Sequence, residues 1–122
     1  MKSTRTIVYG ITNCDTVKKS RAWLVAHAID HDFHDFKKQG LPLAEVDRWI
    51  AQTGYDMLLN RRGTTWRKLP EVIQASVVDA ASAKAVMQLN SSVIKRPIIQ
   101  WQSGQITAGF DETGWLQLIG SS

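Results

Sequence analysis

The most constraining feature of this chain is a strand-like run that passes through a turn into its only cysteine. Thr6–Gly10 is short and rich in β-branched and aromatic residues, which favours a β-strand. Thr12 and Asn13 are turn-forming residues, and Cys14 follows them directly. A helix-like pattern then begins, with Val17 and Leu24 on one side. The segment therefore predicts a strand, a tight turn and a helix with the thiol at the helix start.

A cysteine in this position has a chemically distinctive environment. It faces unpaired backbone N–H groups and the positive end of the helix dipole. Lys18 lies one helical turn further on, and Lys19 and Arg21 are close in sequence. Both influences favour the thiolate and raise nucleophilicity at neutral pH. A lone cysteine is more often a small buried hydrophobe, but this setting favours a reactive thiol at Cys14.

Composition narrows the class of protein. A chain of 122 residues fits one domain, and 43% hydrophobic with 21% charged residues is typical of a soluble globular protein. No apolar run approaches the ~18 residues of a membrane span, and the N-terminus lacks the pattern of a signal peptide. One cysteine cannot form an internal disulfide. We therefore expect a cytoplasmic monomer with no membrane association.

The net charge of +4 comes from cations in several groups, of which the densest is Arg61, Arg62, Arg67 and Lys68. Solvated surface charge is the common explanation of such groups. A small anionic substrate and an acidic protein surface remain open as alternatives. No recognition-helix pattern accompanies the charge, which disfavours direct nucleic-acid binding.

The histidines and the tryptophans are two further sets of candidate site residues. His27, His31 and His34 match no common zinc-ligand spacing, so we expect no metal. Trp23 and Trp49 lie on predicted helix faces and are expected in the core. Trp66 lies inside the basic loop, where it either packs the loop onto the helices or forms a wall facing a ligand.

Turn residues and periodicity divide the rest of the chain into further elements. A polar turn is expected at 37–40. The other expected elements are a helix 15–27, a strand 32–35, a helix from Leu41 ended by Gly54, a helical turn 56–60, a helix from Pro70, a helix 79–89, strands 97–101 and 105–108, and a helix 111–119. The order is β-α-β, a helical block, then β-β-α. Without the block, this is the β-α-β-β-α order of an α/β thioredoxin-like core, with Cys14 where that fold places its thiol.

Four ordered blocks of sequence carry a resemblance to a known family. They are Tyr9–Leu24, Phe33–Lys37, Leu58–Leu69 and Ile94–Ile98. Together they resemble the ArsC/Spx family, and within it the YffB-type branch. The resemblance implies one domain over 1–122. It also implies a thioredoxin-like core at about 6–37 and 93–119 and a helical insertion at about 38–92, between the second and third strands.

The resemblance implies roles for named residues. Cys14 matches the family's nucleophile, and Arg96 matches the arginine before a cis-proline, here Pro97, that faces the thiol. Arg61 and Arg62 fall in the loop that supplies another oxyanion-binding arginine.

One further arginine follows the last hairpin in the arsenate-reducing members of the family. This chain has Ala108, Gly109 and Phe110 there. The resemblance thus implies an arsenate reductase-like protein and leaves its substrate open.

Thr16 and Lys18 are expected to stabilise the Cys14 thiolate. Val17 stands where Spx-like regulators often have a second cysteine, so redox chemistry here requires an external thiol. We expect a monothiol reductase that uses glutathione or glutaredoxin and holds no bound cofactor. The alternative is an Spx-like partner of RNA polymerase without enzymatic activity.

Overall fold

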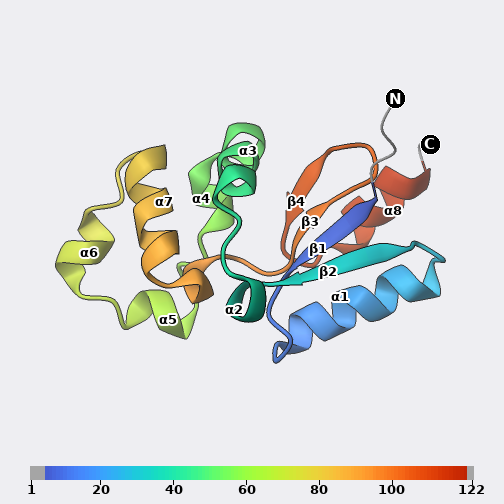
Figure 1. Ribbon diagram of the computed structural model, residues 1–122, viewed down its shortest axis with the longest axis horizontal. Coiled ribbons are helices and arrows are strands. Elements are labelled where there is room, and N and C mark those ends of the chain that lie inside the picture. The colour runs from blue at the N-terminus through green and yellow to red at the C-terminus, as the bar shows by residue number, and fades with distance from the viewer. Residues whose placement is uncertain (1–4, 121–122) are drawn as a thin grey trace.

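The computed structural model describes residues 5–120 and is built around a four-stranded sheet in the order β2-β1-β3-β4 (Figure 1). The strands are β1 (Thr6–Gly10), β2 (His31–Asp35), β3 (Ile98–Gln100) and β4 (Ile106–Ala108). β1 pairs in parallel with β2 and antiparallel with β3, and β3 and β4 form an antiparallel hairpin. This is the thioredoxin-like sheet that the order of elements predicts.

One face of the sheet is covered by the first and last helices, α1 (Asp15–Ala26) and α8 (Glu112–Gly120) (Figure 1). Successive strand residues point to opposite faces, so Val8 and Ile99 point toward these helices. The core on this side consists of Val8, Trp23, Leu24, Ile99, Trp101 and Trp115.

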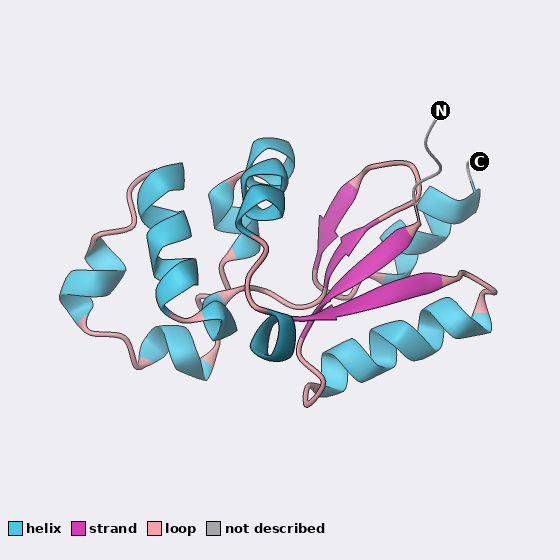
Figure 2. Cartoon of the chain, viewed as in Figure 1, coloured by secondary structure: helices cyan, strands magenta, loops and turns pink. Residues whose placement is uncertain are grey.

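The helical insertion packs against the other face. Figure 2 shows most of its helices gathered beside the strands, in the other half of the molecule. Its elements are α2 (Phe36–Gln39), α3 (Leu43–Thr53), α4 (Tyr55–Leu58), α5 (Thr64–Arg67), α6 (Glu71–Ala75), α7 (Ala80–Leu89) and the 3-10 helix η1 (Ser91–Val93). Trp49 of α3 is fully buried, with its ring centroid 4.8 Å from that of Tyr9 in β1. The insertion and the sheet therefore share one hydrophobic core.

Two short helices replace segments that were predicted as a turn and a loop. The predicted polar turn at 37–40 is largely the single helical turn α2, because the Asp35 carboxylate accepts hydrogen bonds from the first backbone N–H groups. The basic loop contains α5, whose Trp66 is buried in the core. Trp66 therefore packs this loop onto the helical block. The helix expected from Leu41 begins at Leu43, with Pro42 at its N-cap.

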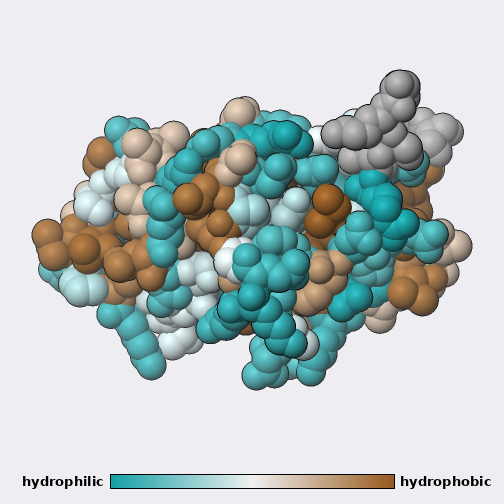
Figure 3. All heavy atoms as spheres, in the orientation of Figure 1, coloured by the Kyte–Doolittle hydropathy of each residue, from teal (hydrophilic) through white to brown (hydrophobic). Residues whose placement is uncertain are grey.

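The surface is polar over most of the face in Figure 3, and apolar side chains gather at the end formed by α6. Val72 and Val78 are exposed in this part of the chain. None of the helices within residues 5–120 is long and apolar enough to cross a membrane.

Candidate active site

Cys14 is the N-cap residue of α1, at the end of the loop that leaves β1. Its backbone is extended, with φ −142° and ψ 119°, and its carbonyl accepts the first helical hydrogen bond from the Lys18 N–H at 3.0 Å. Cys14 is partly exposed, and the backbone N–H groups of Val17 and Thr16 lower the pKa of its thiol. The thiol thus occupies the place where a helix offers unpaired donors.

The Arg96 guanidinium lies near this sulfur, and its positive charge lowers the pKa of the thiol. Arg96 is itself held in place, because its Nη1 donates to the Ser92 carbonyl of η1 at 3.0 Å. Its Nε is buried and has no hydrogen-bond partner among the described residues. A guanidinium that is fixed and half-buried is suited to binding a carboxylate or another oxyanion.

Opposing effects set the acidity of the thiol. Burial raises the pKa of Cys14, whereas the Val17 N–H, the hydrogen bond and charge of Arg96, and the Thr16 N–H lower it; the net result is a pKa below the ordinary value. A lowered pKa enlarges the thiolate fraction near neutral pH, which is the nucleophilic form.

Thr16 and Lys18 were both expected to stabilise the thiolate. Thr16 does so through its backbone N–H. Lys18 is exposed, and its side chain lines a shallow depression with Arg21 and His31 between α1 and β2. Its effect on the thiol stays a prediction.

The Arg96–Pro97 bond is cis, as expected from the sequence. The buried Pro97 carbonyl accepts from the Gly109 N–H at 2.8 Å, at the edge of the sheet where β1 ends. Gly109 has φ 86°, and a methyl group built on it would lie 3.4 Å from Cε of Lys95. The Lys95 side chain therefore lies across Gly109. Gly109 belongs to the segment after the last hairpin, where this chain lacks the further arginine expected of arsenate-reducing members of the family. That Pro97 faces the thiol stays a prediction.

The loop with Arg61 and Arg62 is joined to the segment before Arg96. Leu59 forms a β-bridge with Ile94, which brings the loop alongside this segment. Arg61, however, makes an ion pair with Asp56 at 2.7 Å, and its guanidinium lies 5.0 Å from the centre of the Trp66 ring. Arg62 is exposed and has no ion pair within the described residues. Anion binding by either arginine stays a prediction. Of the two, Arg62 is the one whose charge has no partner within residues 5–120.

Sequence reasoning missed a buried carboxylate near the cysteine. Asp35 ends β2, only 5% of it is exposed, and Thr12 of the cysteine loop donates to it through its backbone N–H and its hydroxyl. The available indication was an acidic residue at the end of the second strand, since neighbouring parallel strands end at the same edge of a sheet.

The described part of the chain contains no group of three or more His, Cys, Asp or Glu side chains that could hold a metal ion. The groups at this site that could hold a ligand are the thiol, Arg96 and the N–H groups at the start of α1.

Comparisons with known proteins agree with this geometry. The model of the ArsC family matches residues 9–118. The chain belongs to the ArsC family. The solved structure of the YFFB (PA3664) protein is 40% identical, with a TM-score of 0.85 over 92% of this chain and 96% of the other. An arsenate reductase (ArsC) related protein of Brucella melitensis is 43% identical, with a TM-score of 0.73 over 98% of both chains.

A more distant curated relative belongs to the regulatory part of the family. The global transcriptional regulator Spx of Streptococcus pyogenes is 29% identical over 103 residues, which cover 82% of this chain and 74% of the relative. Membership of the family therefore places this chain near both arsenate reductase-like proteins and Spx regulators.

Proposed function

We propose that this ArsC-family protein is a thiol oxidoreductase in which Cys14 is the nucleophile. The observation that carries the proposal is the position of a partly exposed thiol at the start of α1, where two backbone N–H groups and the Arg96 guanidinium lower its pKa. A structural cysteine needs none of these partners. The combination favours a thiolate at neutral pH that remains accessible to a substrate.

The chemistry is that of a monothiol, since the chain has one cysteine. The Cys14 thiolate attacks the glutathione sulfur of a mixed disulfide, a new bond joins Cys14 to glutathione, and the other sulfur leaves as a thiolate that takes up a proton. A second glutathione, as its thiolate, attacks this adduct and leaves as oxidised glutathione. Cys14 is then a thiolate again, and one mixed disulfide has been reduced, with one free glutathione consumed and one oxidised glutathione formed.

Arg96 contributes in two ways to this cycle. Its charge stabilises the Cys14 thiolate both before attack and when the thiolate leaves the adduct. Its guanidinium, held in place by the Ser92 carbonyl, suits a carboxylate of the tripeptide. The cytoplasm, where glutathione keeps thiols reduced, is the compartment that suits this reaction.

A second candidate is an Spx-like partner of RNA polymerase. The relationship to Spx of Streptococcus pyogenes and the exposed cations of the insertion favour it. This function needs a docking surface and makes no use of an acidic thiol.

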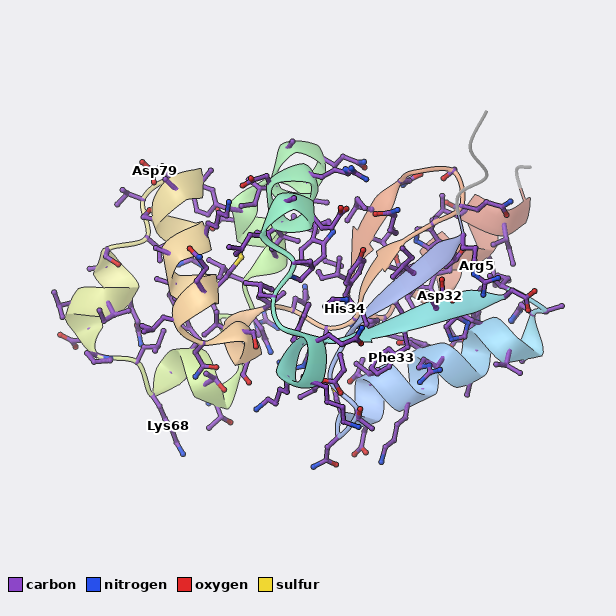
Figure 4. All side chains as sticks on the ribbon, in the orientation of Figure 1. Arg5, Asp32, Phe33, His34, Lys68 and Asp79 are labelled. Carbon is purple, nitrogen blue, oxygen red and sulfur yellow. The ribbon has the colours of Figure 1, made fainter. Side chains whose placement is uncertain are left out.

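The test is the reaction with oxidised glutathione, followed by mass spectrometry. We expect one adduct per chain, and none with Cys14→Ser. Arg96→Ala should slow adduct formation about 10- to 100-fold, because a charge-assisted hydrogen bond is worth ~1.5–3 kcal/mol. Lys68→Ala is the matched control, since Figure 4 shows Lys68 pointing away from the molecule beyond α5.

Equal rates for the wild type, Arg96→Ala and Lys68→Ala would contradict the proposed binding of substrate by Arg96. Absence of any adduct would contradict the enzyme itself. In that case, co-purification of the Cys14→Ser variant with RNA polymerase would support the second candidate.

A further inference from the structure

The Asp35 carboxylate lies at the end of β2, next to the loop that carries Cys14. In the parallel register, Asp35 is paired with Gly10, the last residue of β1. Three residues separate Gly10 from Cys14 in the sequence, and α1 begins immediately afterwards. The end of β2 therefore flanks the segment that sets the position of the sulfur.

The two oxygens of Asp35 serve two different segments. Oδ1 accepts from the backbone N–H groups of Lys37 and Lys38 at 2.7 and 3.2 Å, which caps α2. Oδ2 accepts from the Thr12 N–H at 3.0 Å and from the Thr12 hydroxyl. Both donors to Oδ2 come from one residue, two positions before the cysteine.

The cysteine loop has few other anchors. On one side, the start of α1 packs tightly against β1, because a methyl group on Gly10 would lie 2.7 Å from Cγ2 of Val17. Ile11 and Asn13, on either side of Thr12, make no hydrogen bond among the described residues. The bonds from Thr12 to Asp35 are therefore the polar attachment of the loop between these ends.

We propose that Asp35 is a positioning residue for Cys14, which holds the loop through Thr12 so that the sulfur stays against the N–H groups of α1 and beside Arg96. The inference rests on the proposed function, because the position of the sulfur matters for a thiol that reacts. The role is geometric: a negative charge near a thiolate disfavours it, so charge alone would not activate the cysteine.

The test compares Asp35→Asn, Thr12→Val and Thr12→Ser. The readouts are the pKa of Cys14, from thiolate ultraviolet absorbance against pH, and the alkylation rate with iodoacetamide at neutral pH. We expect Asp35→Asn and Thr12→Val to raise the pKa and slow alkylation about 2- to 10-fold, the range of one ordinary hydrogen bond. Thr12→Ser keeps both donors and should react like the wild type.

The direction in which Asp35→Asn shifts the pKa of Cys14 distinguishes a positioning role from an electrostatic one. A purely electrostatic role predicts a lower pKa of Cys14 in that variant and no change in Thr12→Val, and this outcome would overturn the proposal. Unchanged values in both variants would overturn it as well. Since Asp35→Asn also alters the cap of α2, Asp79→Ala is the control: it removes the cap of α7, at the far end of the molecule in Figure 4, and should leave the thiol unchanged.

The inference and the proposed function fail in different ways. A wild-type Cys14 with the acidity and reactivity of a free thiol contradicts the proposed function. An acidic, reactive wild-type thiol that neither Asp35→Asn nor Thr12→Val changes contradicts the positioning role alone.

Discussion

At the scale of single residues, the acidity of Cys14 comes from groups that are distant in the sequence or belong to the backbone. Burial raises the pKa of the thiol, and the Val17 N–H, Arg96 and the Thr16 N–H lower it further than burial raises it. Arg96 reaches the sulfur from the segment before β3, 82 positions along the chain from Cys14 (96 − 14). Groups from the start of α1 and from the segment before β3 therefore act together on the Cys14 sulfur.

Alkylation of Cys14 as a function of pH tests this assignment. The thiolate reacts, so the rate rises with pH and levels off above the pKa, and we expect a midpoint below the ordinary thiol value of about 8.5. Arg96→Ala should move the midpoint upward and slow alkylation at neutral pH about 10-fold. Lys18→Ala is the matched loss of one positive charge and should have the smaller effect. A larger shift from Lys18→Ala than from Arg96→Ala would restore the sequence-based interpretation, in which the lysine after the cysteine stabilises the thiolate.

At the scale of elements, the parts that follow from local pattern were predictable and the parts that depend on distant contacts were not. The strands, α1, α7 and the β3–β4 hairpin follow from periodicity and turn residues. The single turns α2 and α5 are too short to form alone. They depend on the Asp35 cap and on the burial of Trp66.

The same reasoning applies to the candidate site. Cys14 was found from its position before a helix, which is a local feature, and Arg96 from the resemblance to the ArsC/Spx family. The bonds between Asp35 and Thr12 join residues 23 positions apart, and only the sheet register brings them together. Arg61 was predicted at the site because the family resemblance implies an oxyanion-binding arginine in its loop, whereas its ion pair with Asp56 depends on how α4 and the following loop fold.

One contact between elements joins the insertion to the hairpin. The Gln52 side chain of α3 donates to the Gly104 carbonyl at 2.8 Å and accepts from the Ile106 N–H at 3.0 Å. Gln52→Ala should speed hydrogen exchange at the Ile106 amide about 2- to 10-fold, because one modest hydrogen bond is lost. Gln102→Ala, in the turn of the same hairpin, is the control. Equal exchange at Ile106 in both variants would mean that the side chain of Gln52 does not protect this edge.

At the scale of the whole molecule, the insertion and the sheet share one core. Tyr9, Ile98 and Ile106 of the strands belong to the same buried cluster as Trp49 of α3 and Met87 of α7. A core that spans both parts couples their stability, since neither part can expose its buried side chains without removing packing contacts from the other part. We therefore expect the protein to unfold as one cooperative unit.

Trp49→Phe tests this coupling. The smaller ring leaves a cavity in a tightly packed site, and we expect a destabilisation of about 1–3 kcal/mol, below the ~3–5 kcal/mol of a full truncation to alanine. Hydrogen exchange in denaturant should show the β3 and α7 amides losing protection together, both at lower denaturant than in the wild type. Val25→Ala changes a side chain that is 70% exposed on α1 and should leave both unchanged. If Trp49→Phe lowered protection in α7 while β3 kept its wild-type stability, the insertion would be an independent folding unit and the shared core would not couple the two parts.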